Sequence, residues 1–408
     1  MDTRFETLLA QDEVRTLFDV FPEGNLRVVG GAVRDLILGE AVKDVDFATA
    51  LEPDATLDRL QSAGIKTVPT GIAHGTVTAV VGGRPFEITS LRRDVQTDGR
   101  RAVVTYTDDW SEDARRRDFT FNALYLDAEG AVHDPTGKGL ADAEAGHLRF
   151  VGEASARVRE DYLRSLRFFR FLAHHGRDYD PEALAAIRSH LDGLKSLSAE
   201  RVWAELKRLL EARDPVAAVE LMDAAGVLEV LLPDANNVEG LAAYVRLERR
   251  ESLEVDPLRR LMAMGARLPL PVLTLARRLR MSNKETARLK AWADSGADLS
   301  HLADPITPDR ERMAAIYREG REVIVDRAVL RAAGERDALR SAYFMSLADL
   351  ALGWTPPKFP VSGKDLKQAG FAPGEDMGRR LKALEALWVK GGFRASREEL
   401  VAAARMLG

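Results

Sequence analysis

The sequence predicts an α+β protein, in which a head of strands and short helices precedes a long helical region. Up to about residue 150, apolar segments alternate with turn signals, and GTVTAVVGG followed by RPFEITSLR predicts a hairpin around Gly82 and Gly83. AVVTYTD and FTFNALYLD add further alternating segments. From Ala154 onward strand signals vanish, and Leu, Ala, Arg and Glu recur at helical spacing almost to the end. These patterns favour an α+β or α/β head and an all-helical remainder.

The composition is that of a globular protein with more than one domain. The chain has 408 residues, 46% hydrophobic and 30% charged, and this length favours about two to four domains. The absence of cysteine excludes structural disulfides, Cys-ligated zinc and thiol catalysis. The N-terminus is charged and periodic, unlike a signal peptide, and no apolar run is long enough to span a bilayer. We therefore expect a cytoplasmic protein with no membrane contact.

The overall net charge is not the one that is usual for a nucleic-acid-binding protein. The net charge is -5 at pH 7, whereas a basic domain is the usual footprint of such binding. Basic residues are nevertheless clustered locally, at Arg115–Arg117, at Arg157–Arg170 and at Arg277, Arg278, Arg280 and Lys284. A globally acidic chain can carry a basic groove, so the composition is compatible with an RNA partner.

The first chemical motif is a Gly-Gly turn between a strand and a helix. The apolar run Leu26–Val29 predicts a short strand that stops at Gly30 and Gly31, where the backbone can approach a phosphate closely. Ala32–Gly39 predicts a short helix, whose N-terminal amides, together with Arg34, favour an anion. The turn therefore suits a bound triphosphate.

Two carboxylates follow this helix. Asp44, Val45 and Asp46 predict a second strand, in which residues two apart share a face, so that both carboxylates point one way while Val45 and Phe47 face the core. Like charges this close are tolerated when a divalent cation lies between them, and Mg2+ is the natural candidate. The alternative is an ordinary turn followed by solvated acids. The joint occurrence of both motifs argues against it.

Glu87 is a third candidate acid. It alternates with Phe86 and Ile88 in a predicted strand. The pattern alone leaves two interpretations open, a further carboxylate of the metal site or the polar face of that strand.

Arginines immediately precede Asp118 in RRRDFTFNAL. Arginine forks suit phosphate or ribose oxygens, and Asp118 can accept a 2'-hydroxyl or orient an arginine. A solvated basic turn held by Asp118 explains the same residues equally well. Asn122 lies within an otherwise apolar predicted strand, where a buried amide must be hydrogen-bonded, so we expect it to brace a loop.

RVREDYLRSLRFFRF predicts one amphipathic helix over Arg157–Phe171. On its polar side Arg164 is a neighbour of both Asp161 and Glu160. A carboxylate beside a guanidinium presents an acceptor next to donors, which matches the Watson-Crick edges of cytosine and adenine and not those of uracil and guanine. Asp161 and Arg164 would thus select C and A without a template. The alternative is a stabilising ion pair on a helix surface.

Taken together, these segments resemble a known family. GGAVRD with DVDFATA, HGTVTAVV, FEITSLR, RRDFTFNAL, DPTGKGLAD and REDYLRSLRFFRF occur in the order seen in class II tRNA nucleotidyltransferases, the CCA-adding enzymes, and their bacterial poly(A) polymerase relatives. SAERVWAELKRLL and VSGKDLKQAGFAPGEDMGRRLKAL resemble later helices of the family. The resemblance implies a polymerase-β-like nucleotidyltransferase head at 1–150, a helical neck at 151–215, a helical body at 216–300 and a helical tail at 301–408.

The resemblance also implies a role for each candidate residue. It makes Asp44 and Asp46 the metal-binding catalytic acids. It also assigns nucleotide contacts: Gly30, Gly31 and Arg34 to the triphosphate; Arg116, Arg117 and Asp118 to the ribose; Asp161 and Arg164 to the base; and Arg157 and Arg167, in the same motif region, to phosphates. We add Glu87 as a further catalytic candidate, and Lys43 and Asn122 as further nucleotide-binding candidates.

Three further segments bear on the resemblance to this family. Tyr162 occupies a position where the family often has proline, so we expect the helix entry to differ. DPTGKGLADAE carries an apparent one-residue expansion before Asp142, which affects that loop and not the metal site. Asp94–Asp113 is a long polar stretch that resembles the mobile loop these enzymes use near the active site.

The function that the resemblance implies is template-independent addition of C, C and A to the 3' end of tRNA. CTP and ATP are the substrates, Mg2+ is the cofactor, and pyrophosphate is released. Three alternatives stay open: a poly(A) polymerase, an enzyme that adds only CC or only A, and a noncatalytic RNA-binding protein. The presence of both Asp44 and Asp46 argues against the last. We expect the helical tail to hold tRNA through salt-sensitive backbone contacts.

Overall fold

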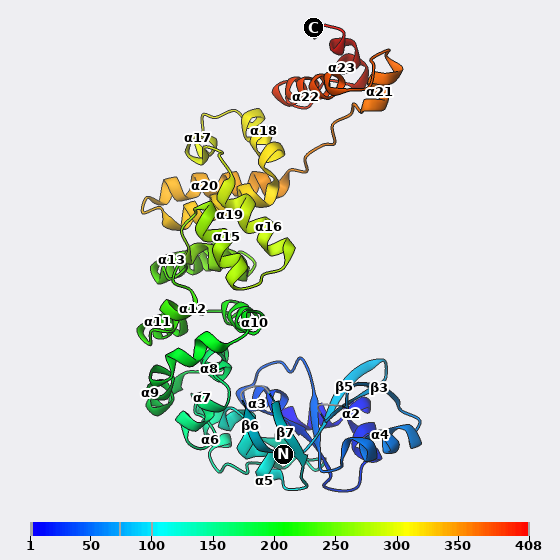
Figure 1. Cartoon of the computed structure of the whole chain (residues 1–408), viewed down its shortest axis with the longest axis vertical. Coiled ribbons are helices and arrows are strands. Elements are labelled where there is room, and N and C mark those ends of the chain that lie inside the picture. Colours follow the sequence, from blue (N-terminus) through cyan, green and yellow to red (C-terminus); the bar gives the residue numbers. More distant parts are fainter. Residues whose placement is uncertain (1–2, 73–74, 99–100, 407–408) are drawn as a thin grey trace. The chain divides into compact units, whose positions relative to one another are not determined.

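The computed structural model describes residues 3–72, 75–98 and 101–406. The chain divides into two compact units, Met1–Leu231 and Leu232–Gly408. Among the described residues, strands occur only in the first unit, and the last of them is β11 (Asp178–Tyr179) (Figure 1). The predicted α+β head and helical remainder are therefore confirmed.

A seven-stranded sheet forms the centre of the first unit, in the order β3-β4-β5-β2-β1-β8-β9. These strands are β1 (Leu26–Val29), β2 (Asp46–Thr49), β3 (Lys66–Gly71), β4 (Thr76–Val81), β5 (Arg84–Ser90), β8 (Tyr125–Leu126) and β9 (Val132–His133). β4 and β5 form the predicted hairpin, with Val81 opposite Arg84. Two further pairs stand apart from this sheet, β6 (Arg92–Asp98) with β7 (Arg101–Tyr106) and β10 (His147–Leu148) with β11.

Helices of the first unit flank the sheet and then continue the chain. α3 contacts β1, and α4 packs on β3, β4 and β5. The head helices are α1 (Thr3–Leu9), α2 (Asp12–Val20), α3 (Gly31–Leu38), α4 (Pro53–Ser62), α5 (Trp110–Arg116), the 3-10 helix η2 (Thr120–Asn122) and α6 (Gly139–Ala145). The following helices are α7 (Ala154–Glu160), α8 (Leu163–His175), α9 (Pro181–Ser189), the 3-10 helix η3 (Leu191–Ser196), α10 (Ala199–Leu210), α11 (Val216–Ala224) and α12 (Val227–Leu231).

Strand β2 lies between β5 and β1. It runs parallel to β5, with Phe47 opposite Ile88, and antiparallel to β1, with Val29 opposite Asp46. Val45 and Phe47 are buried as predicted. Their burial anchors the acidic segment to the core of the sheet.

The strand at the acids starts later than predicted. Asp44 and Val45 precede β2 without regular structure, so of the two acids only Asp46 belongs to the sheet. A second predicted strand, across FTFNALYLD, is also shorter, because η2 replaces its first part. There the Asn122 amide donates to Asp118 at 3.1 Å, and such local side-chain hydrogen bonds compete with strand pairing.

The single helix predicted over Arg157–Phe171 is two helices. α7 ends at Glu160 and α8 begins at Leu163, with Asp161 in extended backbone between them. The Asp161 side chain accepts a hydrogen bond from the Leu163 amide at 3.1 Å, as an N-cap residue does. The Tyr162 ring lies against Gly193, where a Cβ would overlap the ring. A difference from the helix entry of the family stays a prediction.

The stretch Asp94–Asp113 contains regular elements. Its described part continues the hairpin of β6 and β7 and then enters α5 at Trp110, while residues 99 and 100 lie outside the described residues. The alternating segment predicted at AVVTYTD is therefore β7. The mobility of Asp94–Asp113 stays a prediction.

The second unit consists of helices around separate hydrophobic clusters. One cluster includes Tyr244, Leu299, Ile324 and Phe344, and another lies between residues 361 and 404. The helices are α13 (Val238–Arg250), α14 (Pro257–Met264), α15 (Pro269–Arg278), α16 (Asn283–Asp294), α17 (Leu299–Ala303), α18 (Asp309–Glu319), α19 (Arg321–Gly334), α20 (Ala338–Gly353), α21 (Gly363–Gln368), α22 (Glu375–Lys390) and α23 (Arg397–Ala404). The four-part domain division stays a prediction.

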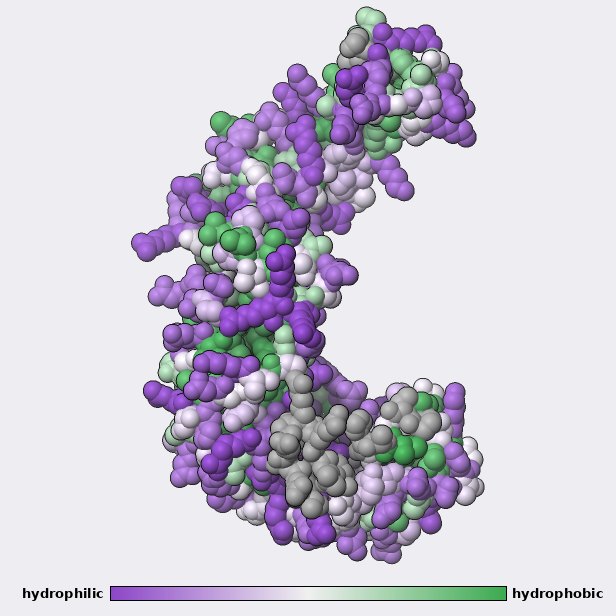
Figure 2. Space-filling model, viewed as in Figure 1, coloured by the Kyte–Doolittle hydropathy of each residue, from purple (hydrophilic) through white to green (hydrophobic). Residues whose placement is uncertain are grey.

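The face seen in Figure 2 is mainly hydrophilic, with apolar side chains in small separate patches. Large apolar residues with high exposure, such as Leu270 and Ile306, are far apart in the sequence. Isolated exposed apolar residues are normal on folded proteins and do not mark a docking face. This face therefore favours polar and charged contacts.

The buried residue Asp113 of α5 connects this helix to strand β8 of the sheet through Tyr125. Its carboxylate, 1% exposed, accepts hydrogen bonds from Arg116 Nε at 2.8 Å, Arg117 Nη2 at 2.9 Å and the Tyr125 hydroxyl at 2.8 Å. Burial alone would raise the pKa of Asp113, but the two guanidiniums and the tyrosine outweigh burial and lower that pKa to about 2. Of the two interpretations left open for these arginines, the solvated basic turn held by Asp118 is therefore wrong, because Asp113 holds Arg116 and Arg117.

We predict that Asp113→Asn lowers the free energy of unfolding at pH 7 by about 3–5 kcal/mol, because two guanidiniums lose their shared buried carboxylate. The folded-state pKa of about 2 lies below the unfolded value of about 3.9. The stabilisation from ionised Asp113 is therefore complete above about pH 4 and is lost as the pH falls through the folded-state pKa.

Urea unfolding at several pH values measures this effect. The stability advantage of the native protein over Asp113→Asn should shrink by roughly 2 kcal/mol between about pH 5 and pH 2. The matched control is Asp108→Asn, which alters an exposed carboxylate nearby. An advantage that does not depend on pH contradicts the prediction.

Candidate active site

The register of the sheet brings two of the predicted acids together. Because Phe47 lies opposite Ile88 on the parallel strands β2 and β5, the residues before them, Asp46 and Glu87, are neighbours on one face. Both are exposed. Asp44 lies two residues before Asp46, just outside the sheet.

The electrostatics of Asp46 reflect these neighbours. Desolvation, followed by the charges of Glu87 and Asp44, raises the pKa of Asp46, while Arg117 opposes the rise. Asp46 is exposed, so its desolvation comes from flanking protein and not from complete burial. A divalent cation relieves repulsion of this kind, and carboxylate oxygens are the ligands that hard divalent cations prefer. The donor set of Asp44, Asp46 and Glu87 therefore fits such a cation.

Gly30 places the N-terminus of α3 beside the acids. Gly30 has φ 68° and ψ -120°, a conformation that L side chains rarely adopt, and it directly precedes α3. Its amide donates to the Leu124 carbonyl at 3.1 Å, which fixes the turn. Because Val29 lies opposite Asp46, Gly30 and Gly31 follow β1 at the end where β2 begins. The turn predicted to bind phosphate and the predicted metal ligands are therefore adjacent.

Arg34 is buried behind this turn. It is 6% exposed, and its guanidinium donates to Asn122 Oδ1 at 2.7 Å and to Asp35 Oδ1 at 2.6 Å. The rings of Phe121 and Phe171 lie 5.6 and 5.2 Å from it. The observed role of Arg34 is thus to brace the turn, and a phosphate contact stays a prediction. Asn122 is buried and satisfied and braces this segment, as predicted.

Asp118 joins the head to helix α8. It is 9% exposed, and it accepts hydrogen bonds from Asn122 Nδ2 at 3.1 Å and from Arg167 Nε at 2.7 Å. Burial alone would raise the pKa of Asp118, but the charge of Arg167 and the hydrogen bonds outweigh burial and lower it. Arg167 also lies 3.8 Å from Glu205 of α10. We call this series the buried polar chain: Asp35, Arg34, Asn122, Asp118, Arg167 and Glu205.

Asp161 and Arg164, the predicted base-selecting residues, are held by different partners. Asp161 Oδ2 accepts from Arg201 of α10 at 2.7 Å. Arg164 donates to Glu160 at 2.5 Å and to the Arg116 carbonyl at 3.0 Å. Both residues lie at the α7–α8 junction, and only 13% of the Arg164 side chain is exposed. The interpretation as a simple surface ion pair between these two residues therefore does not describe them.

The remaining predicted residues lie nearby in the same unit. Lys43 is exposed immediately before Asp44. Arg157 donates to the Arg115 carbonyl at 2.9 Å, so α7 contacts the C-terminal end of α5. Arg116 and Arg117 have their guanidiniums on Asp113, and a ribose contact from them stays a prediction.

Sequence reasoning missed Asp113, Arg201 and Glu205, which organise the site, and it named Glu160 only as a neighbour of Arg164. Asp113 precedes Arg116 and Arg117 by three and four residues, a helical spacing that provides a signal for pairing. Glu160 had a comparable signal toward Arg164. Arg201 and Glu205 lie far along the chain from their partners, so their contacts carry no local signature.

A different group of potential ligands lies near α3. One ligand atom from each of Asp35, Glu40 and His175 falls within 4.8 Å of the others. His175 Nδ1 lies 2.9 Å from Glu40 Oε2, and Asp35 already accepts from Arg34. Burial, followed by the charge of Arg34, lowers the pKa of His175 to about 3. These groups satisfy one another among nearby cations, so we assign no metal to them.

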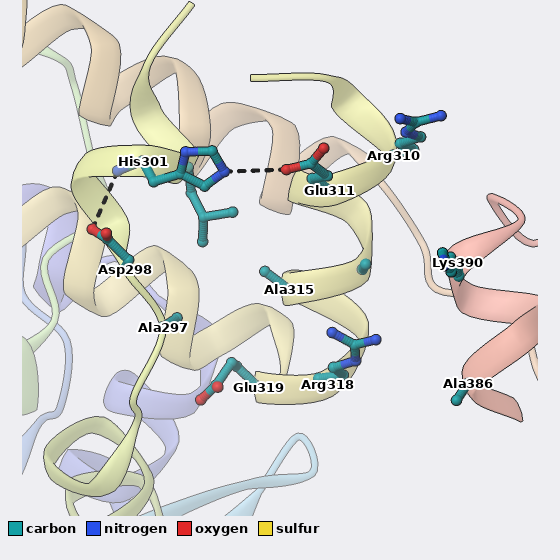
Figure 3. Close-up of a pocket in the computed structure, with 12 residues that line it drawn as sticks. Ala297, Asp298, His301, Arg310, Glu311, Ala315, Arg318, Glu319, Ala386 and Lys390 are labelled. Carbon is teal, nitrogen blue, oxygen red and sulfur yellow. Dashed lines mark hydrogen bonds and ion pairs between the residues drawn. The ribbon is translucent and has the colours of Figure 1, made fainter. Parts of the chain in front are cut away.

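The second unit contains a groove lined by basic residues of α18 and α22. Its volume is about 690 Å³, and Arg310, Arg318 and Lys390 line it (Figure 3). His301 and Glu311 form an ion pair of 3.1 Å at the same groove. All three cations are exposed. Asp298, Glu311 and Glu319 line the same groove, so it holds as many carboxylates as Arg and Lys side chains. We call this feature the charged groove.

None of the helices in the described residues is long and apolar enough to cross a membrane. Two family models match the chain. The model of the poly A polymerase head domain matches residues 26–149, and the model of the probable RNA- and SrmB-binding site of polymerase A matches residues 178–238. The first match contains the acids and the Gly-Gly turn. The second contains Arg201 and Glu205.

Relatives of the whole chain carry consistent names. The mitochondrial CCA tRNA nucleotidyltransferase 1 of Danio rerio is 35% identical over 97% of this chain and 91% of its own length. The protein of the same name from Homo sapiens is 34% identical over 97% and 90%. The CCA-adding enzyme of Levilactobacillus brevis is 32% identical over 92% of each chain.

Solved structures agree with these relatives. The Bacillus stearothermophilus CCA-adding enzyme in complex with CTP superposes with a TM-score of 0.71 and 26% identity, over 100% of this chain and 98% of that chain. The Thermotoga maritima CCA-adding enzyme complexed with tRNA, at 18% identity and a TM-score of 0.67 over 98% of both chains, shares the fold. The chain therefore belongs to the family of class II CCA-adding enzymes and poly(A) polymerases.

Proposed function

We propose that this chain adds C, C and A to the 3' end of tRNA from CTP and ATP and releases pyrophosphate. The observation that carries the proposal is the adjacency of Asp46 and Glu87 to the Gly30 turn, in a chain 35% identical over 97% of its length to a CCA tRNA nucleotidyltransferase. Solved relatives in complexes with CTP, with ATP and with tRNA support the substrates.

Mg2+ is the proposed metal, with Asp44 and Asp46 as its ligands and Glu87 as a further catalytic carboxylate. When bound, Mg2+ would activate the terminal hydroxyl and offset charge on the triphosphate. The chain itself holds Asp46 next to Glu87 through the β2–β5 register. The reaction joins the terminal tRNA oxygen to the α-phosphorus and breaks the bond from that phosphorus to pyrophosphate.

The Gly-Gly turn is proposed to receive the triphosphate. Gly30 and Gly31 carry no side chain that would separate the backbone from a phosphate, and the N-terminus of α3 favours negative charge. Arg34 supports the turn from behind through Asn122 and Asp35. Lys43 is exposed beside the acids and adds a flexible cation.

Base selection is proposed to depend on Asp161 and Arg164. Their present partners, Arg201 and Glu160, hold the side chains at the α7–α8 junction. The Asp161 carboxylate accepts and the Arg164 guanidinium donates, which is the pattern that cytosine and adenine require. Arg116 contacts this junction, because its carbonyl accepts from Arg164. Arg116, Arg117 and Asp118 are the proposed ribose-binding residues.

The cations of the charged groove are the proposed contacts for the tRNA backbone. Arg310, Arg318 and Lys390 are exposed cations of the kind that contact phosphates without reading sequence. Binding through such contacts weakens steeply as salt rises. We also propose a cytoplasmic location, while the names of the animal relatives place those proteins in mitochondria.

We predict that Asp46→Asn lowers incorporation of CTP and ATP into tRNA lacking its CCA end by more than about a hundredfold. Loss of a residue that only supports a metal ligand already costs about 10–100-fold, so loss of a ligand costs more. The assay uses purified protein, Mg2+ and one labelled nucleotide at a time. Asp58→Asn, an exposed acid on α4, is the matched control and should keep full activity.

The products of the native chain separate the alternatives. Addition of three residues, C, C and then A, supports the proposal. Long A tracts identify a poly(A) polymerase, and products that end at CC or contain a single A identify a partial enzyme. No incorporation at all favours the noncatalytic alternative. Full activity of Asp46→Asn contradicts the metal assignment.

We further predict that Asp161→Ala relaxes discrimination against UTP and GTP by roughly 10–100-fold, the effect of losing about 1–3 kcal/mol of base-specific hydrogen bonding. The ratio of kcat/KM for CTP and UTP measures it. Arg201→Gln is the control, because it frees Asp161 from its observed partner but keeps the carboxylate. Unchanged selectivity in Asp161→Ala removes the base-selecting role.

A further inference from the structure

A second cavity of the helical unit has a cationic lining. Its volume is about 520 Å³, within the range of small-molecule sites. Residues of α13, α14, α16, α17 and α19 and of the segments between these helices line it, among them Asn237, Arg267, Asp298, Arg327 and Arg331. We call it the Arg327 cavity. It differs from the charged groove because one of its cations is buried and Asp298 is its one lining carboxylate among the described residues.

Arg327 is that buried cation. It lies on α19, is 9% exposed, and its Nη1 donates to Ser295 Oγ at 2.7 Å. Its Nε is buried and has no hydrogen-bond partner in the described part of the chain. Within the same described residues, no carboxylate forms an ion pair with Arg327. A buried guanidinium is normally paired, because an uncompensated charge is costly away from water.

The surroundings of Arg327 are also cationic. Burial, followed by the charge of Arg267, lowers the pKa of Arg327, while Glu319 and Asp298 oppose this weakly. Arg267 Nη1 donates to the Ser295 carbonyl at 2.9 Å, so Arg267 is fixed at the end of α16. Arg331 lies 2.9 Å from Glu335 and is largely exposed.

The N-terminus of α13 and the hydrogen-bonded carboxylate of Asp298 also line the cavity. α13 has 13 residues and begins after Asn237, whose side chain accepts from the Gly240 amide at 2.9 Å. The positive end of this helix faces the same cavity that Asn237 and Gly240 line. Asp298 accepts from the amides of Ser300 and His301, so its charge is directed to the start of α17. The cavity therefore offers more positive than negative charge.

We propose that the Arg327 cavity binds a phosphate group, with the Arg327 guanidinium as its principal donor. An anion in the cavity would compensate the charge of the buried guanidinium, and guanidinium forks match phosphate oxygens. The phosphate comes either from an RNA backbone or from free phosphate or pyrophosphate. The first source rests on the proposed function, whereas the second does not.

Binding of inorganic phosphate and pyrophosphate to the full chain, in a buffer without other multivalent anions, is the first test. Saturating ligand should raise the Tm of the native protein by about 2–5 °C, and Arg327→Gln should abolish the rise. Without ligand, Arg327→Gln should keep or raise the Tm, because it removes an unpaired buried charge and retains a donor for Ser295. Arg246→Gln, an exposed arginine of α13, is the control.

Binding of tRNA measured over a range of salt separates the two sources. If the ligand is an RNA phosphate, Arg327→Gln weakens tRNA binding about tenfold or more and lowers the slope of log Kd against log salt by about one. If it is free phosphate, only the Tm response is lost. Arg331→Gln, at an exposed position, should give a smaller loss of the same kind and serves if Arg327→Gln does not fold.

Two results would overturn the inference. One is equal responses of Arg327→Gln, Arg331→Gln and the native protein to phosphate, pyrophosphate and tRNA. The other is a lower Tm of Arg327→Gln with full retention of ligand responses, which would make Arg327 a brace for Ser295. Neither measurement needs nucleotide incorporation, so failure of the proposed catalytic function would be recognised separately.

Discussion

The ion pair between Asp118 and Arg167 is the interaction on which the first unit depends. Asp118 lies beside η2 in the head, and Arg167 lies on α8, so one buried carboxylate fastens the two parts together. Through Asn122 the same carboxylate reaches Arg34, which braces the Gly30 turn. Removal of one partner of such a pair leaves a charge without compensation in the protein interior, at a cost of about 3–5 kcal/mol.

The buried polar chain links the Gly30 turn to helices α8 and α10, and it thereby holds the two parts of the proposed site in one structure. The carboxylates of β2 and β5 lie where the proposed reaction takes place. Asp161 and Arg164 lie at the α7–α8 junction, where the base would be selected. Asp113 supports the second of these, because it holds Arg116 at the C-terminal end of α5, and the Arg116 carbonyl accepts from Arg164. A guanidinium on a helix C-terminal carbonyl is a stabilising cap. The nucleotide would therefore meet a surface whose parts are fixed by buried contacts.

Much of the fold was predictable because its signals are local. The alternating strands around Gly82 and Gly83, the Gly30 turn and the change to helical spacing all depend on neighbours in the sequence. The helix break at Asp161 was missed because neither glycine nor proline marks it. It arises from the Asp161 cap and from the Tyr162 ring against Gly193, 31 positions away. At the shortened strand, the Asn122 side chain donates to Asp118, four residues earlier, and accepts from Arg34 of α3. The second of these contacts is distant in the sequence and carries no local signal.

A double-mutant cycle on Asp118 and Arg167 tests this account most directly. The free energy of unfolding in urea is measured for the native chain, Asp118→Asn, Arg167→Met and the double variant. If the pair joins head and helix as described, the coupling energy is at least about 2 kcal/mol, and the double variant is more stable than the sum of the single losses predicts. Additive losses, equal within about 0.5 kcal/mol, would contradict the central role of this ion pair.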